Sequence, residues 1–142
     1  MKVKEVMTPQ VIRISPEETV AVAARTLTHY NIGVLPVCTN DGGICGMLTD
    51  RDIVTRCLAA GHRPEKTPVR AIMTNTVISA LPDMDAGVAA SLMARRQVRR
   101  LPVVDGGKLC GMVTLGDLSQ NQDTAPDATD ALAEITGNVV DR

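Results

Sequence analysis

The sequence predicts an α+β protein, α/β-like in the alternation of its elements, built from two tandem β-α-β-β-α repeats. Two observations carry this prediction. The 142-residue chain matches itself at an offset of about 65 residues, and both copies show the same order of strand and helix patterns. A period of this length exceeds the usual solenoid units, so it indicates one duplicated supersecondary unit. A chain of this size has room for one domain, or for two small halves that share a core.

Several motifs of the two copies align in register. The aligned pairs are Val3–Thr8 with Val69–Thr74, Pro16 with Pro82, Val22–Ala24 with Val88–Ala90, Leu35–Val37 with Leu101–Val103, and Cys45–Met47 with Cys110–Met112. We therefore expect a first repeat over residues 1–61, a linker over 62–68 and a second repeat over 69–121. The linker is polar and is stiffened by Pro64 and Pro68.

Each element of the first repeat has a local reason. Apolar residues recur at i, i+3, i+4 and i+7, the spacing of a core-facing helix: Val20, Ala23, Ala24 and Leu27. We expect this helix to begin in a capping box at Ser15–Glu18, with Pro16 at its first position, and to end near Asn31. The other elements are a strand over 11–14, a strand pair over 34–38 and 44–49 around a glycine turn, and a helix over 50–60 that Gly61 stops.

The second repeat runs the same way. We expect strands over 77–80, 99–104 and 109–114, a helix over 83–96, and a short helix from Leu115. Residues 122–142 form an acidic tail in which five acids face only Arg142: Asp123, Asp127, Asp130, Glu134 and Asp141. The tail predicts a short helix over residues 130–135, stopped at Gly137.

Composition and charge argue against several classes of function. The chain has one tyrosine and no phenylalanine or tryptophan, so it lacks the aromatic platforms that stack single-stranded nucleic acid. A net charge of −1 argues against duplex DNA. The tail contributes −4, so residues 1–121 carry +3, a balance that suits a small anionic ligand. With no signal segment and no long apolar stretch, we expect a cytoplasmic protein without a membrane partner.

Four cysteines leave a second function open. Cys38, Cys45, Cys57 and Cys110 lack the CxxC spacing of zinc ribbons and thioredoxin-like proteins. We interpret them as small buried apolar residues. The alternative is a redox- or metal-responsive interaction protein that uses these cysteines and binds no nucleotide.

Both repeats close on the same short motif, a strand that ends in threonine and is followed three residues later by aspartate. The pairs are Thr49 with Asp52 and Thr114 with Asp117. A hydroxyl and a carboxylate at a strand-to-helix junction can both hydrogen-bond a sugar diol, and free helix N–H groups favour a nearby anion. The same residues are also good helix caps. Their duplication in register favours ligand contact.

These motifs carry a family resemblance. A Met-Thr start, a Leu-Pro-Val strand and a Gly-x-x-Thr-x-x-Asp close, each present twice, resemble the paired CBS domain (cystathionine-β-synthase domain, or Bateman module) over residues 1–120. Among stand-alone bacterial members the chain is similar to the hypoxic-response type, which has a segment like Leu48–Val54. The resemblance implies two repeats packed with pseudo-two-fold symmetry. It also implies a regulatory module that binds an adenosine-containing ligand such as AMP, ADP, ATP or S-adenosylmethionine in the cleft between the repeats, with no required cofactor.

The resemblance also implies site residues. The two Thr and Asp pairs would hold ribose and phosphate, and the base would lie against the first strand of each repeat, at Val11, Ile12, Val77 and Ile78. Arg99 and Arg100 match basic residues that reach the phosphates in the family, whereas the first repeat has Gly33 and Val34 there. We therefore expect two unequal sites. Since side chains alternate along a strand, we expect only one of the two arginines to face the ligand.

Other signals are weaker. Arg95 and Arg96 fit a solvated helix end. The sequence holds no nucleophile elbow, Walker loop or His-Glu-x-x-His motif, so we expect no enzyme activity. The helices carry more apolar residues than one stripe needs, and this excess predicts a homodimer through some of these residues: Ile53, Val54, Cys57, Leu58, Val88, Ala89, Leu92 and Met93. No motif identifies the regulated protein.

Overall fold

The computed structural model describes the backbone of residues 1–140 and the surroundings of side chains up to residue 137. Asp141 and Arg142, which the tail prediction includes, lie outside the described residues. The chain divides into two compact units. Unit 1 combines Met1–Val11 with Ile78–Arg142, and unit 2 is Ile12–Val77. Each unit therefore contains most of one repeat together with the segment that opens the other repeat.

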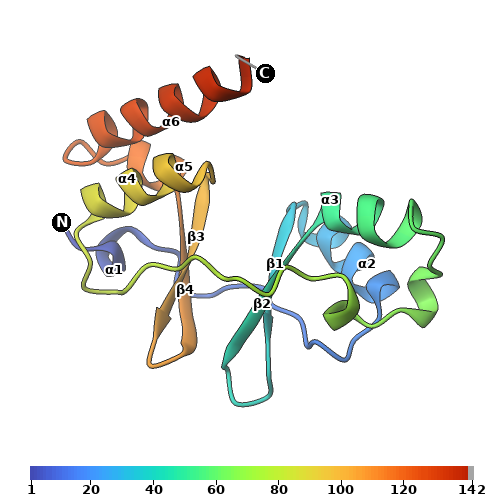
Figure 1. Cartoon of the computed structure of the whole chain (residues 1–142). Helices are drawn as coiled ribbons and strands as arrows, with labels where there is room; N and C mark the ends of the chain where they lie inside the picture. The colour runs from blue at the N-terminus through green and yellow to red at the C-terminus, as the bar shows by residue number, and fades with distance from the viewer. Residues whose placement is uncertain (141–142) are drawn as a thin grey trace. The chain divides into compact units, whose positions relative to one another are not determined.

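The fold class is confirmed, since each unit combines helices with a small antiparallel sheet (Figure 1). Unit 2 contains α2 (Val20–Tyr30), β1 (Val34–Cys38), β2 (Ile44–Thr49), α3 (Asp50–Asp52), the π-helical η1 (Ile53–Leu58), and the short 3₁₀ turns η2 (Pro64–Lys66) and η3 (Val69–Ala71). Unit 1 contains α1 (Val3–Val6), α4 (Ala86–Arg96), β3 (Arg100–Asp105), β4 (Lys108–Thr114), α5 (Leu115–Ser119) and α6 (Ala125–Val140).

The helix starts differ from those that the sequence predicts. Helix α2 begins at Val20 rather than in a box at Ser15–Glu18, because the Thr19 hydroxyl accepts a hydrogen bond from the Val22 N–H at 3.2 Å. Helix α4 likewise begins at Ala86 after Asp85, whose carboxylate accepts from the Gly87 N–H at 3.0 Å. The left-handed Asn31 ends α2 as predicted.

The predicted first strands are single bridges. Only Ile14 of residues 11–14 pairs: its N–H donates to the Pro36 carbonyl at 3.0 Å, and its carbonyl accepts from the Cys38 N–H at 2.9 Å. Ala80 bridges Val103 in the same parallel sense. These contacts extend the edge of each sheet by one residue.

Helix α6 is longer than predicted. It runs over Ala125–Val140 instead of residues 130–135 and passes through Gly137. Its Ala128, Ala131 and Ile135 are 3–4% exposed and extend the core of unit 1. That packing supports the helix through the glycine, which local propensity alone disfavours. No helix within the described residues is long and apolar enough to cross a membrane.

The Met-Thr segment at the start of each repeat pairs with the outer strand of a sheet through backbone hydrogen bonds. Thr8 pairs with Met112 of β4, with N–H to carbonyl distances of 2.8 and 2.9 Å. Thr74 pairs with Met47 of β2 in the same way, at 2.9 and 3.0 Å. Each sheet therefore gains an outer partner from a segment that belongs to the other sequence repeat.

Glycine permits this close approach. A Cβ at Gly111 would lie 2.5 Å from the Met7 Sδ and 3.0 Å from the Thr8 carbonyl oxygen. At Gly46 the corresponding distances, to Met73 and Thr74, are 2.6 and 3.0 Å. The methionine can move, but the carbonyl is fixed by the strand pairing. The glycine of each Cys-Gly-Met motif is therefore explained by packing.

We predict that Gly111→Ala lowers the free energy of unfolding by about 1–3 kcal/mol, because the added methyl group overpacks the contact with Thr8. Gly137→Ala is the matched control: nothing lies within 4 Å of its Cβ position, and alanine in a helix is favoured over glycine by about 1 kcal/mol. Urea unfolding followed by circular dichroism measures both changes. A Gly111→Ala protein as stable as the parent would contradict the packing role.

Candidate functional site

The two predicted Thr and Asp pairs form reciprocal capping boxes. In unit 1 the Thr114 N–H donates to Asp117 Oδ2 at 2.9 Å, and the Asp117 N–H donates to Thr114 Oγ1 at 3.0 Å. In unit 2 the same two bonds join Thr49 and Asp52, both at 3.0 Å. Each box fixes the side chains at the end of a strand. The threonine O–H and the second carboxylate oxygen keep hydrogen-bonding capacity for a ligand.

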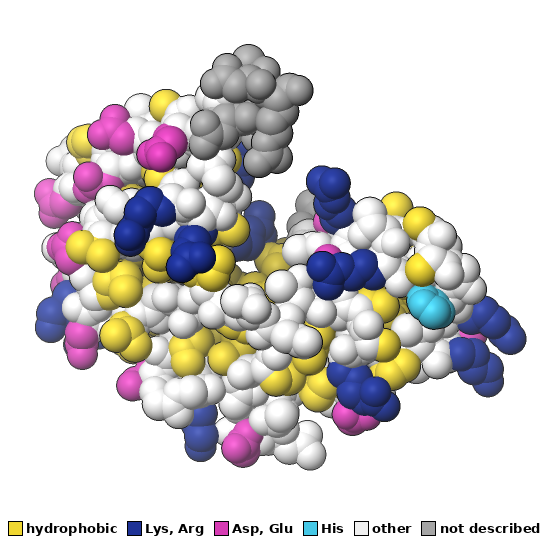
Figure 2. Space-filling view, in the orientation of Figure 1, with side chains coloured by type: hydrophobic (Ala, Val, Ile, Leu, Met, Phe, Trp, Pro, Cys, Tyr) yellow, Lys and Arg dark blue, Asp and Glu magenta, His cyan; other side chains and the backbone are white. Residues whose placement is uncertain are grey.

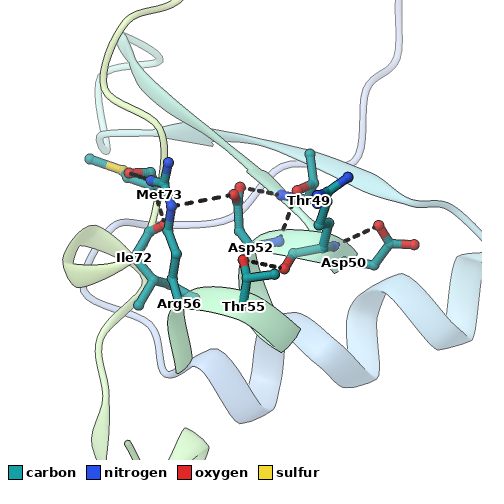
Figure 3. Close-up of polar contacts among 8 residues, drawn as sticks. Thr49, Asp50, Asp52, Thr55, Arg56, Ile72 and Met73 are labelled. Carbon is teal, nitrogen blue, oxygen red and sulfur yellow. Dashed lines mark hydrogen bonds and ion pairs between the residues drawn. The ribbon is translucent and has the colours of Figure 1, made fainter. Parts of the chain in front are cut away.

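Asp52 has a further partner that sequence reasoning missed (Figure 3). The Arg56 Nε lies 3.8 Å from Asp52 Oδ1, one turn along the helix. The Arg56 Nη1 also donates to the carbonyls of Ile72 and Met73, each at 3.4 Å. The Asp52 carboxylate therefore already faces Arg56, which also contacts the segment that leads to Thr74. At the aligned position the second repeat has Asn121, so Asp117 has no such partner.

Unit 1 holds a pocket of about 420 Å³ beside its capping box. It is lined by Arg99, Arg100, Thr114, Leu115, Gly116, Ser119, Ala128, Thr129 and Leu132. Three predicted site residues, Arg99, Arg100 and Thr114, thus share one pocket, while Asp117 lies outside the lining. The wall from α6 was not predicted. Among the described residues that line this pocket, the two arginines are charged and none is a carboxylate.

Both arginine side chains are exposed, and neither has a partner among the described residues. Neither Arg99 nor Arg100 makes an ion pair or a side-chain hydrogen bond with any residue that the structure describes. The Arg99 carbonyl accepts from the Leu115 N–H at 3.0 Å, which holds this residue beside the start of α5. Alternation does not separate the two side chains at this pocket, because β3 begins only at Arg100 and Arg99 lies in the bend before it. Both arginines line this pocket, and the expectation that only one of them faces the ligand stays a prediction.

The equivalent place in unit 2 has the opposite charge. Gly33 stands at the position of Arg99, and its carbonyl accepts from the Asp50 N–H at 3.0 Å. Asp50 stands at the position of Leu115, and its Oδ2 lies 3.4 Å from where a Cβ of Gly33 would be. A carboxylate therefore occupies the region where unit 1 presents an arginine. The two units offer different environments to an anion.

The four residues expected to hold the base are divided between the units. Val11 and Ile78 belong to unit 1, and Ile12 and Val77 belong to unit 2. Ile78 packs against the core of unit 1, and Ile12 is 36% exposed. None of the four lines the arginine pocket. Their contact with a base stays a prediction.

Within the described residues the cysteines form neither a disulfide nor part of a cluster of metal-ligating side chains. All four thiols are free, and the described residues contain no group of three or more side chains that could hold a metal ion. The Cys45 and Cys110 thiols donate to the carbonyls of Val37 and Val103, at 3.4 and 3.3 Å. Burial raises the pKa of the thiols of Cys38, Cys45 and Cys110, so the reactive thiolate is disfavoured. These observations weigh against the redox- or metal-responsive alternative.

Comparison with known proteins agrees with this geometry. The family model of the CBS domain matches residues 3–59 and 69–122. The chain belongs to the CBS domain family. The CBS domain-containing protein YhcV of Bacillus subtilis is 44% identical over 134 residues, which cover 94% of each chain. The chain is thus a pair of CBS domains, a regulatory type of module.

Solved structures also resemble the chain. The crystal structure of Hypoxic Response Protein I with two coordinated zinc ions has a TM-score of 0.79 and 31% identity, over 85% of this chain and 98% of that one. The CBS domain pair of protein MJ0100, in complex with 5′-methylthioadenosine and S-adenosyl-L-methionine, has a TM-score of 0.74 and 30% identity, over 84% and 98% of the two chains. Some members of this fold therefore bind adenosine compounds.

We predict slow alkylation of the native cysteines. Because the raised pKa of Cys38, Cys45 and Cys110 lowers their thiolate fraction, iodoacetamide at pH 8 should modify them at least several-fold more slowly than free cysteine. The rate should rise to that of free cysteine in urea. Mass spectrometry of the quenched reaction measures both rates. Native cysteines that react as fast as the free amino acid would support the redox alternative.

Proposed function

We propose that this protein is a regulatory sensor of an adenosine-containing anion of the AMP, ADP or ATP class, and that the pocket of unit 1 holds the phosphate. One observation carries the proposal: Arg99 and Arg100, which pair with no residue that the structure describes, line a pocket without a described carboxylate. Thr114 lines the same pocket, and its hydroxyl is held by the capping box. The relatives' adenosine compounds support the nucleoside part of the ligand.

Charge favours phosphate in unit 1 over unit 2. A hydrogen bond to a charged group contributes about 1.5–3 kcal/mol, and a guanidinium matches phosphate geometry with two parallel donors. Unit 1 offers two such groups beside Thr114. Unit 2 offers Gly33 and the Asp50 carboxylate in the equivalent place, and its Asp52 is already paired with Arg56. We therefore infer unequal sites, with the phosphorylated ligand preferring unit 1.

Regulation would follow from differential binding. A ligand that binds one conformation of the protein better than another shifts the population toward that conformation, by no more than the difference in its two affinities. No catalytic group is needed for this role. In this proposal, the ligand-bound conformation of this chain is the one that binds the regulated protein.

We predict that Arg99→Ala and Arg100→Ala each weaken AMP binding by about tenfold or more, because each removes a charge-assisted hydrogen bond. Adenosine, which lacks the phosphate, should bind the parent and both variants alike. Arg96→Ala is the matched control, since Arg96 is an exposed arginine at the end of α4 that does not line the pocket. Isothermal titration of ligand-free protein gives the dissociation constants. Normal AMP binding by both variants, or no heat from the parent at millimolar AMP, would refute the proposal.

We also propose that the protein is a homodimer. Some of the helical apolar residues are buried within the units, including Ile53 and Met93. Others remain exposed, with Val54 at 56%, Leu58 at 54% and Val88 at 50%. Val54 and Leu58 are one turn apart on η1, and exposed apolar pairs of this kind are typical of interfaces.

For the dimer, sedimentation at micromolar concentration should give twice the 15.1 kDa of one chain. Leu58→Asp should shift the protein toward the monomer, because a charge would be buried in the interface. Thr55→Asp, at an exposed neighbouring position, is its control. A parent protein that sediments as a monomer would exclude the dimer.

A further inference from the structure

Helix α6 is fixed on unit 1 by its own anchors. Ala128, Ala131 and Ile135 are buried against α4 and α5. At the start of the helix the buried Thr124 hydroxyl donates to the Leu118 carbonyl of α5. The family match ends at residue 122, before this helix begins. A role for α6 would therefore be an addition to the matched CBS pair.

The two edges of α6 differ in chemistry. One edge carries Asp127, Asp130 and Glu134, which lie along a groove with Arg95 of α4. The other edge carries Thr129 and Leu132, which line the arginine pocket. Figure 2 shows acidic side chains gathered over this part of unit 1. The described acids Asp127, Asp130 and Glu134 thus line a different groove from the two arginines.

Leu132 and Thr129 are unexplained by packing. Leu132 is 43% exposed, although the neighbouring core positions of the same helix are almost fully buried. Thr129 lines the pocket, and its hydroxyl donates to the Ala125 carbonyl at 3.0 Å, so the oxygen can still accept a hydrogen bond. An apolar side chain and a hydroxyl oxygen thus stand in the same pocket as two cations. This combination suits a ligand with an anionic end and an apolar or planar body.

We propose that Leu132 and Thr129 of α6 contact the ligand of unit 1 and select nucleotides whose nucleoside part fits between this helix and Arg99 and Arg100. The inference rests on the proposed function, because it assigns the other wall of the same pocket. Since the ligand contacts both α6 and the matched CBS domain, its binding stabilises the docked helix. By linkage, any change that loosens the packing of α6 on unit 1 also lowers the affinity for the nucleotide.

The test is a titration of the full chain with AMP, followed by methyl NMR of labelled leucines. The Leu132 and Leu115 methyl resonances should shift with one saturation curve, because both residues line the pocket. Leu132→Ala should weaken AMP binding about fivefold because an apolar contact is lost, and Thr129→Val should weaken AMP binding about threefold. Alanine has the highest helix propensity, so the first change does not loosen the helix. Ala133→Ser, on the exposed face of α6, is the control and should leave binding unchanged.

The outcomes separate the two proposals. If AMP shifts neither the Leu115 nor the Leu132 resonance, the proposed function fails and this inference fails with it. If the Leu115 resonance shifts while Leu132 is unmoved, and Leu132→Ala and Thr129→Val bind AMP like the parent, only the role of α6 is overturned. The buried Leu118 resonance reports whether each variant keeps the fold.

Discussion

Both units depend on one steric constraint, the approach of a Met-Thr backbone to a glycine in the second strand of each hairpin. Gly46 and Gly111 lack the Cβ that would collide with Met73 and Met7, so the strands can bond to Thr74 and Thr8. The opening segment of each sequence repeat is thereby placed in the unit of the other repeat. The repeats of the sequence therefore do not coincide with the two packed units. Each sheet and each core is completed by a segment that is distant in sequence. The capping box at the end of the same strand, and the pocket beside it, are built on that sheet.

The same scaffold carries different charges in its two copies. In unit 1 the cations stand at the start of β3, at Arg99 and Arg100, and no described acid lines the pocket. In unit 2 the cation follows the strand, at Arg56, where it is engaged by Asp52 and by two carbonyls. Backbone hydrogen bonds are conserved between the copies while electrostatics are not. Duplication thus keeps the framework, and single substitutions set which unit suits an anion.

Much of the fold could be predicted because its signals are local. Glycine turns and alternating apolar residues define β1, β2, β3 and β4, and the Thr and Asp pairs cap helices whether or not they bind a ligand. The sequence could not show that residues 11–13 stay unpaired, because pairing depends on the partner strand. It could not show α6 as a pocket wall either, since helix length there follows from the burial of Ala128, Ala131 and Ile135. Arg56 was missed because its partners, Asp52 and the distant carbonyls, come together only in the fold.

We propose above all that Arg99 and Arg100 receive the phosphate of an adenosine ligand in unit 1. The side-chain Nε–H resonances of arginine report this contact directly in a ¹⁵N-labelled protein. We predict that AMP shifts the Arg99 and Arg100 resonances, that adenosine leaves them in place, and that the Arg96 resonance is unaffected by either compound. An AMP-induced shift confined to Arg51 or Arg56 of unit 2, or no arginine shift at saturating AMP, would contradict it.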